Sequence, residues 1–166
     1  TFNVNMLALV DGLQPRILNL KTILEEFIKH RQEIIRRRTT YDLNKAKERA
    51  HILEGLIMAL ARIDEVIATI KASKDKDQAR VNLMKQFKLS ERQAIAILEM
   101  KLQTLANLER LKVETELKEK SKIITELEQI LSSDILVLNI IKQECQDIAE
   151  KYGDDRRTTI VNQSIT

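Results

Sequence analysis

The chain has 166 residues, of which 43% are hydrophobic, 32% charged and only 3% aromatic, with three glycines and one proline. This scarcity of turn-forming and aromatic residues, with a near balance of 28 basic and 25 acidic side chains, is typical of long helices and coiled coils and speaks against a compact globular domain. Cys145 is the only cysteine, so an internal disulfide is excluded, and no apolar run reaches the roughly 18 residues of a membrane helix. We therefore expect a reduced, cytoplasmic, soluble protein.

Apolar residues stand at every second position of the opening segment, at Phe2, Val4, Met6, Ala8 and Val10. The chain then reaches Asp11, Gly12 and Pro15, which favour a turn. We predict a strand and a turn over residues 1–18. Because an isolated hairpin is only marginally stable in water, we expect this segment to belong to a larger sheet.

Residues 19–73 are predicted to form one long helix. Asn19 is a suitable N-cap, and before Ser73 only Gly55 weakens the helix, by about 1 kcal/mol relative to Ala. Apolar residues recur at alternating steps of three and four, as they do in the narrow seam of a coiled coil. The seam consists of Leu43, Ala46, Ala50, Leu53, Ile57 and Leu60, and Ile63, Ile67 and Ile70 continue it after a skipped residue.

Residues 74–110 have a different character. We predict a short helix from Asp75 to Phe87, and Ser90 with Gln93 forms a capping-box pattern that opens a second helix. The apolar residues from Ala94 to Leu108 cover more than one face of that second helix, and a single hairpin cannot bury them all. Such an excess of apolar surface is what an oligomer interface needs.

Residues 111–153 are predicted to form a return helix, followed by a tail over residues 154–166. The helix is expected to bend or restart near Ser132 to Asp134, with the phase of its seam continuing across that point. The predicted seam consists of Val113, Leu117, Lys120, Ile124, Leu127, Leu131, Asp134, Leu138, Ile141, Cys145, Ile148 and Tyr152. The fold class is therefore mainly α, a long antiparallel coiled-coil hairpin with a small helical head and a short β segment at the N-terminus.

No catalytic or metal-binding group is predicted. The sequence has no glycine-rich phosphate loop, and His30 and His51 lack a metal-ligand spacing, so we interpret both as helix-surface residues. Tyr41 and Tyr152 are conceivable nucleophiles, but neither has the acidic cluster that would hold Mg²⁺. We interpret both tyrosines as structural, with Tyr152 in the core.

The segment from Lys29 to Arg49 is basic, with eight positive and three negative side chains. Two interpretations of Arg36, Arg37 and Arg38 remain open. They form a solvated helix surface that pairs with Glu33 and Asp42, or they form a wall that faces the phosphates of DNA.

Several motifs together resemble the A subunits of bacterial DNA gyrase and topoisomerase IV, which are type IIA DNA topoisomerases. The resemblance covers nearly the whole chain. The motifs are NMLALVDG (5–12), RRT and YDL (37–39 and 41–43), KAKERAHILEGL (45–56), IDEVI (63–67), LSERQA (89–94), AILEMKLQ (96–103) and YGDDRRT (152–158).

The resemblance implies a fold and a place within the longer protein. It assigns residues 1–18 to the end of the tower domain, 19–73 and 111–153 to coiled-coil arms, 74–110 to the dimerisation head of the exit gate (C-gate), and 154–166 to a tail toward the C-terminal domain. The nucleophilic tyrosine of the family follows an arginine, whereas Tyr41 follows Thr40 and Tyr152 follows Lys151. The resemblance therefore carries over no catalytic residue, and this chain alone is expected to be inactive.

The resemblance also implies partners and cofactors. The whole protein would break and rejoin double-stranded DNA to pass a second duplex, introducing negative supercoils with ATP hydrolysed on a partner, the gyrase B protein, in an assembly of two copies of each. It would use Mg²⁺, and it would lie in the bacterial cytoplasm with the chromosome. Arg36, Arg37 and Arg38 would line the DNA cavity, and a homodimer would form through Ala94, Ile97, Leu98, Lys101, Leu102 and Leu105.

Two other classes of function remain as alternatives. One is a purely structural coiled-coil scaffold that dimerises, against which the predicted N-terminal strand argues. The other is an autonomous nucleic-acid-binding arm, whose binding to duplex DNA would fade steeply with salt.

Overall fold

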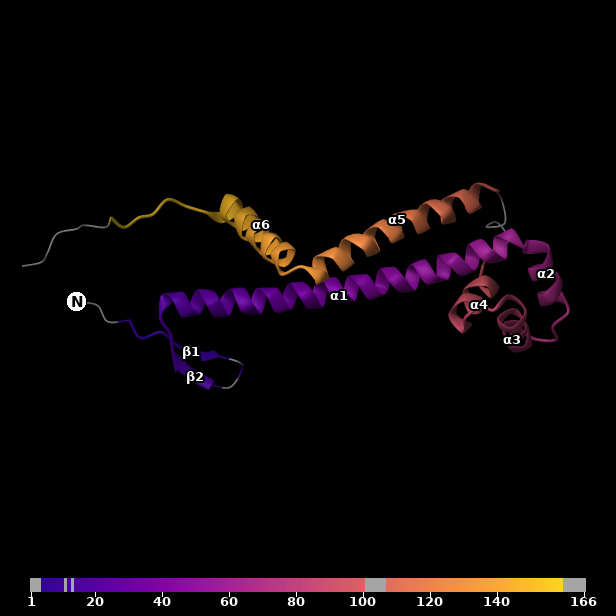
Figure 1. Cartoon of the computed structure of the whole chain (residues 1–166), viewed down its shortest axis with the longest axis horizontal. Helices are drawn as coiled ribbons and strands as arrows, with labels where there is room; N and C mark the ends of the chain where they lie inside the picture. Colours follow the sequence, from indigo (N-terminus) through magenta and orange to yellow (C-terminus); the bar gives the residue numbers. More distant parts are fainter. Residues whose placement is uncertain (1–3, 11, 13, 101–106, 160–166) are drawn as a thin grey trace, which may run out of the picture. The chain divides into compact units, whose positions relative to one another are not determined.

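The computed structural model of this chain (Figure 1) describes residues 4–10, 12, 14–100 and 107–159. These residues form six helices and one two-stranded antiparallel sheet. Over the described residues, Arg37–Ser132 makes one compact unit, and Thr1–Arg36 with Ser133–Thr166 makes another. The predicted fold class, mainly α with a long first helix and a short β segment, is confirmed; the five functional regions assigned from the resemblance stay predictions.

The β segment is a hairpin of β1 (Leu7–Val10) and β2 (Gln14–Ile17). Its register places Leu7 opposite Ile17 and Leu9 opposite Pro15, so these apolar residues share one face of the ladder. Gly12 has a φ of +82° in the turn, a conformation that few other residues adopt without strain. The apolar face is exposed, with Leu7 at 66% and Ile17 at 75%, and the larger sheet expected here stays a prediction.

The first helix, α1, runs from Leu20 to Ala61. Asn19 caps it as predicted, because its Oδ1 accepts hydrogen bonds from the backbone N–H and the hydroxyl of Thr22, each at 2.9 Å. The predicted seam is confirmed over its first four members, which are buried, while the next two are half-buried. The four buried members are Leu43, Ala46, Ala50 and Leu53.

The helix does not continue to Ser73 as predicted. It ends at Ala61, Arg62 adopts a non-helical conformation with φ −126° and ψ 40°, and α2 follows from Ile63 to Lys71. No glycine or proline marks this break. The side chain of Val66 on α2 is 1% exposed and lies in one core with Ala59 near the end of α1. The helix therefore breaks where α2 packs into the head, and not at a helix-breaking residue.

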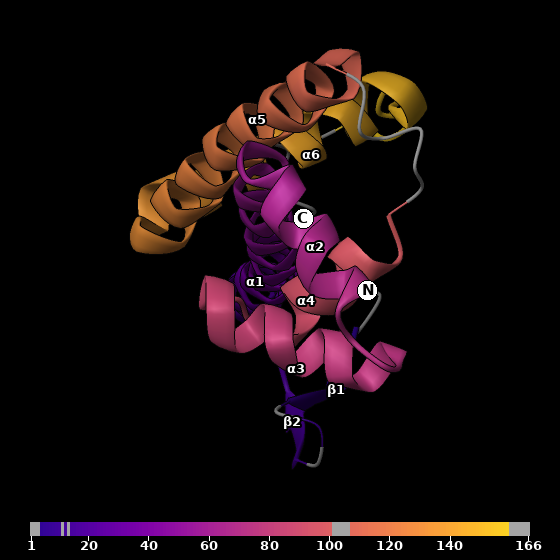
Figure 2. The same ribbon diagram turned by 90° about the vertical axis from the view of Figure 1, so that its right-hand side faces the viewer.

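The head consists of α2, α3 (Lys76–Phe87) and α4 (Glu91–Leu98), which lie close together beside the last part of α1 in Figure 2. Asp75 and Ser90 cap α3 and α4, and the predicted capping box of Ser90 and Gln93 is present. Lys88 ends α3 with a left-handed φ of 54°. The core of the head is formed by Ala59, Val66, Leu83, Phe87, Leu89, Ala94 and Ile97.

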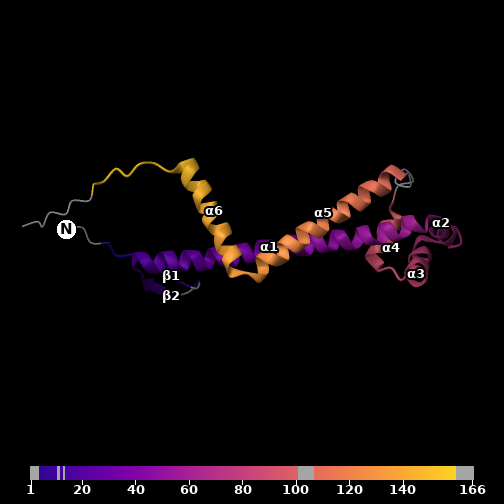
Figure 3. The same cartoon turned by 45° about the horizontal axis from the view of Figure 1, so that its top comes forward.

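The next helix, α5, spans Asn107–Ser132 and runs back along the second part of α1 (Figures 1 and 3). Val113 is buried, and the other predicted seam residues of α5 are half-buried. The predicted seam is therefore confirmed over this helix. Its half-buried members are Leu117, Lys120, Ile124, Leu127 and Leu131.

The return arm restarts at Ser133, as predicted, and α6 spans Asp134–Tyr152. The seam, however, does not keep its phase. Of the predicted seam residues, Ile141 is buried, and so is Val137, which was not predicted. Leu138, Ile148 and Tyr152 are 41%, 59% and 70% exposed, and Cys145 is exposed too. Because successive helical residues are about 100° apart, a shift of one residue turns most of the predicted seam toward solvent. The interpretation of Tyr152 as a core residue was therefore wrong.

Candidate functional site

Three of the six residues predicted for the dimer interface lie in the described part of the head. Ala94 and Ile97 are 0% and 4% exposed and belong to the head's own core. Leu98 is half-buried and packs on the edge of that core. Lys101, Leu102 and Leu105 lie outside the described residues. Contact with a second copy stays a prediction, and in this conformation Ala94 and Ile97 would support such a surface from within.

The head is joined to α1 by a polar junction that contains the α4 capping box. The backbone N–H of Ser90 donates to Gln93 Oε1 at 2.9 Å, and the Ser90 hydroxyl lies 2.7 Å from His51 Nε2 on α1. The amide of Gln93 donates to the backbone carbonyl of His51 at 2.8 Å. His51 is on the helix surface as predicted, yet it also holds α4, a role that its sequence context did not indicate.

Gly55 allows α4 to approach α1 closely at this junction. A Cβ built on Gly55 would lie 2.6 Å from Gln93 Cγ and 2.8 Å from Gln93 Cβ. Gln93 is 7% exposed, and both ends of its amide are already hydrogen-bonded. The glycine that weakens the helix in the sequence is therefore the residue that admits Gln93.

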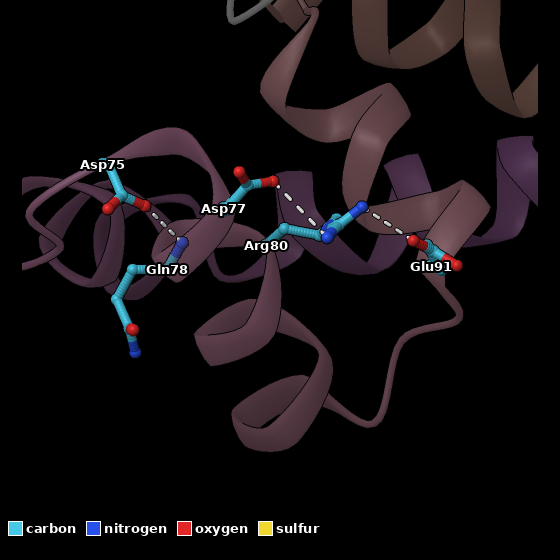
Figure 4. Close-up of polar contacts among 5 residues, drawn as sticks. All are labelled: Asp75, Asp77, Gln78, Arg80 and Glu91. Atoms are coloured by element: carbon cyan, nitrogen blue, oxygen red, sulfur yellow. Dashed lines mark hydrogen bonds and ion pairs between the residues drawn. The ribbon is translucent and has the colours of Figure 1, made fainter.

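A second set of polar contacts fastens α3 to α4 (Figure 4). Arg80 on α3 donates to Glu91 Oε1 at 2.7 Å and lies 3.4 Å from Asp77 Oδ1. Asp75 accepts the backbone N–H of Gln78 at 2.7 Å and so caps the start of α3. Because Glu91 is in the first turn of α4, this arginine links the starts of both head helices.

The basic residues of α1 make ion pairs with the return helices. Within one unit, Arg31 pairs with Glu144, and Arg36 pairs with Asp134. Within the other, Lys47 Nζ lies 2.6 Å from Glu128 Oε1. The interpretation of a solvated surface expected these arginines to pair with acidic residues of the same helix. These ion pairs instead join α1 to other helices. Arg37 and Arg38 are exposed on α1.

Arg49 and Glu116 form the best-defined ion pair between α1 and α5. Arg49 Nε and Nη2 donate to the two carboxylate oxygens of Glu116 at 2.7 and 2.8 Å, a bidentate arrangement. The hydrogen bond from Arg49 lowers the pKa of Glu116, with burial opposing this and the charges of Arg49 and Lys120 adding to it. The same hydrogen bond raises the pKa of Arg49. This pair joins α1 to α5 at one point along the two helices.

A metal-binding cluster is not found in the part of the chain that the structure describes. No group of three or more His, Cys, Asp or Glu side chains there could hold a metal ion. Tyr41 is 66% exposed, and the ring of Tyr152 lies 5.2 Å from Lys151 Nζ. Among the same residues, none of the helices combines the length and the apolar character that a membrane crossing needs.

The family model that describes the A subunits of DNA gyrase and topoisomerase IV matches residues 1–146. The chain belongs to this family. It is 54% identical over 160 residues to the DNA gyrase A protein of Clostridium acetobutylicum, 50% identical over 164 residues to that of Brachyspira hyodysenteriae and 49% identical over 160 residues to that of Staphylococcus aureus.

These matches cover 96%, 99% and 96% of this chain, but only 19%, 20% and 18% of the respective relatives. The chain therefore spans about a fifth of the length of the DNA gyrase A proteins it matches. The resemblance drawn from its motifs is confirmed at the level of the family.

Proposed function

We propose that this chain is the exit-gate part of the A protein of a type IIA DNA topoisomerase, in which two copies meet through the α2–α4 head. The observation that carries the proposal is the family match over residues 1–146, which includes the whole head. The architecture supports it, since long helices hold a small head that has its own apolar core.

The full-length protein is proposed to break and rejoin double-stranded DNA and to pass a second duplex through the break. We assign it negative supercoiling with ATP hydrolysed on a gyrase B partner, in an assembly of two copies of each protein in the bacterial cytoplasm. It would use Mg²⁺ at a catalytic centre outside this chain, where the family's nucleophilic tyrosine follows an arginine. Arg36, Arg37 and Arg38 are proposed to face the DNA cavity; Arg36 also pairs with Asp134.

Half-buried apolar side chains near the end of the head support the proposal that a second copy binds there. Ile95, Ala96, Leu98 and Met100 are half-buried in the single chain, so they retain apolar area that a partner can cover. A gate must hold two copies together and yet open, which suits a small apolar patch better than an obligate interface of several thousand Å².

The test is sedimentation velocity of the wild-type chain and of Leu98→Glu. The wild type is expected to sediment as a dimer and the variant as a monomer, because a buried carboxylate at the patch has no partner. Ile148→Glu, at an exposed position of α6, is the matched control and should remain dimeric. Far-ultraviolet circular dichroism shows whether each variant is folded, and Ile95→Glu provides a second test if Leu98→Glu unfolds.

If Leu98→Glu and Ile95→Glu are both folded and still dimeric, the assignment of the head as the dimer interface is wrong. The main alternative within the family is the A protein of a topoisomerase IV, which the matching family model also includes. The gyrase assignment is favoured because each of the three relatives above is a gyrase A protein. A purely structural scaffold is disfavoured by the family match.

A further inference from the structure

A groove of about 450 Å³ lies between α1 and α5 within the Arg37–Ser132 unit. Three positive and two negative side chains line it, so its net charge is +1. They come from both helices, and the lining also includes the apolar Ala46 and Ile123. The charged residues are Asp42, Lys45, Arg49, Glu116 and Lys120.

Glu116 is the anion held between cations in this groove. Its two oxygens accept parallel N–H bonds from Arg49, and the charge of Lys120 also favours its ionised form. Arginine binds a phosphate group in the same way, because its guanidinium donates two parallel hydrogen bonds to two oxygens. The carboxylate of Glu116 therefore occupies the position in which a phosphate would be bound.

The ion pair is accessible to a ligand from solution. The side chains of Arg49 and Glu116 are 46% and 34% exposed, and Lys45 is exposed on the same helix. In each of the four ion pairs described above between α1 and a return helix, the cation lies on α1. An incoming polyanion would thus meet cations on α1 whose present partners are carboxylates.

We propose that this groove binds a backbone phosphate of duplex DNA through Lys45, Arg49 and Lys120, with Glu116 as an internal competitor that leaves when DNA binds. The inference rests on the proposed function in one respect, namely that this part of the protein meets DNA. It adds a contact site on the arm and a reason for that contact to be weak, which suits a segment that DNA must leave again.

The experiment measures fluorescence anisotropy of a labelled duplex of about 20 base pairs, titrated with the 166-residue chain at several salt concentrations. Glu116→Gln is expected to bind the duplex more tightly than the wild type, by up to about fivefold, because DNA no longer displaces an exposed ion pair. The slope of log K against log salt should stay close to that of the wild type, because both proteins make the same phosphate contact once DNA is bound. Arg49→Gln and Lys120→Gln should each weaken binding.

Glu119→Gln is the matched control, because it removes the same charge from α5 outside the lining of the groove. Glu119→Gln should change the affinity for the duplex less than Glu116→Gln does. The double variant Glu116→Gln/Arg49→Gln should lose the increase in affinity that Glu116→Gln gives. Equal gains from the two glutamines would mean that net charge alone acts, and would overturn the proposal. No binding by any variant would overturn it too.

This outcome is separable from the test of the exit gate. Glu116 is on α5 and not on the head, so Glu116→Gln should sediment like the wild type. A normal dimer with no effect of Glu116→Gln on DNA binding would reject the groove and keep the gate. If the wild type is a monomer but Glu116→Gln binds DNA more tightly, the gate is rejected and the groove is kept.

Discussion

Gly55 illustrates how one residue can be unfavourable locally and required by its surroundings. Within a helix, glycine costs about 1 kcal/mol relative to alanine. Here the missing Cβ leaves room for Gln93, whose side chain cannot move away because it caps α4 and also bonds to the carbonyl of His51. The close approach of two helices therefore explains this glycine, and chain flexibility does not.

Gly55→Ala is expected to lower the free energy of unfolding. The added methyl would overlap the base of the Gln93 side chain, and overpacking of this kind costs about 1–3 kcal/mol, which equals or exceeds the gain in helix propensity. Urea denaturation followed by circular dichroism measures the change.

The control for this substitution is Glu54→Ala, at the neighbouring exposed position, which should stay within about 0.5 kcal/mol of the wild type. A Gly55→Ala variant that is more stable than the wild type would contradict the role of Gly55 in admitting Gln93. It would mean that α4 adjusts to the methyl group at no cost in free energy of unfolding.

Among the elements, those with a local signal were predictable and those determined by tertiary contacts were not. Asn19 and the Ser90 capping box are recognisable from residues a turn apart, and both caps are present. The break at Arg62 has no local signal, because it accompanies packing of α2 in the head core. Most of the α6 seam, all but Ile141, was misassigned because the restart at Ser133 removes any reason for the heptad phase to continue.

The site was predictable only in part for the same physical reason. The apolar excess near Ala94 was visible in the sequence, but which of its members face inward depends on α2 and α3. The partners of Arg49 and Arg36 lie 67 and 98 residues away along the chain. A run of basic residues in the sequence shows where positive charge lies. Which acidic side chains neutralise it depends on how the helices pack.

The Arg49–Glu116 pair between α1 and α5 predicts a specific pH dependence. The pKa of Glu116 is lowered in the folded chain from its ordinary value of 4.5. Its contribution to stability is therefore complete above that value and is lost as the pH falls through the lower, folded-state pKa. Wild type should exceed Glu116→Gln in stability by no more than about 1 kcal/mol near neutral pH.

That difference should shrink as the pH falls below about 4.5. Urea midpoints at pH values from about 7 down to about 3 give the comparison. Glu119→Gln serves as the reference and should show a smaller, flatter difference. A gap between wild type and Glu116→Gln that widened on acidification would contradict the assignment of this pair.

For the whole molecule, the described residues divide into two units, and each contains ion pairs between α1 and a return helix. None of the described residues forms a metal cluster, and the chain spans about a fifth of the gyrase A proteins it matches. Under the exit-gate proposal, the activity of the full protein depends on residues outside this chain.

The 166-residue chain is expected to leave supercoiled plasmid unchanged in the presence of Mg²⁺ and ATP. Within the described part of the chain, neither Tyr41 nor Tyr152 has a neighbouring carboxylate cluster that could hold the metal. Agarose gel electrophoresis and a test for protein covalently attached to DNA give the readout, with a complete gyrase as the positive control. Covalent attachment through either tyrosine would contradict the interpretation of both as non-catalytic.

The outward position of Cys145 on α6 has a practical consequence for observing this molecule. It is the only cysteine in the sequence and it is exposed, so a maleimide fluorophore or a nitroxide would attach at one defined position without prior mutagenesis. Two labelled copies in a dimer would carry one probe each. Energy transfer or dipolar spectroscopy could then follow the spacing of the two α6 helices directly in solution.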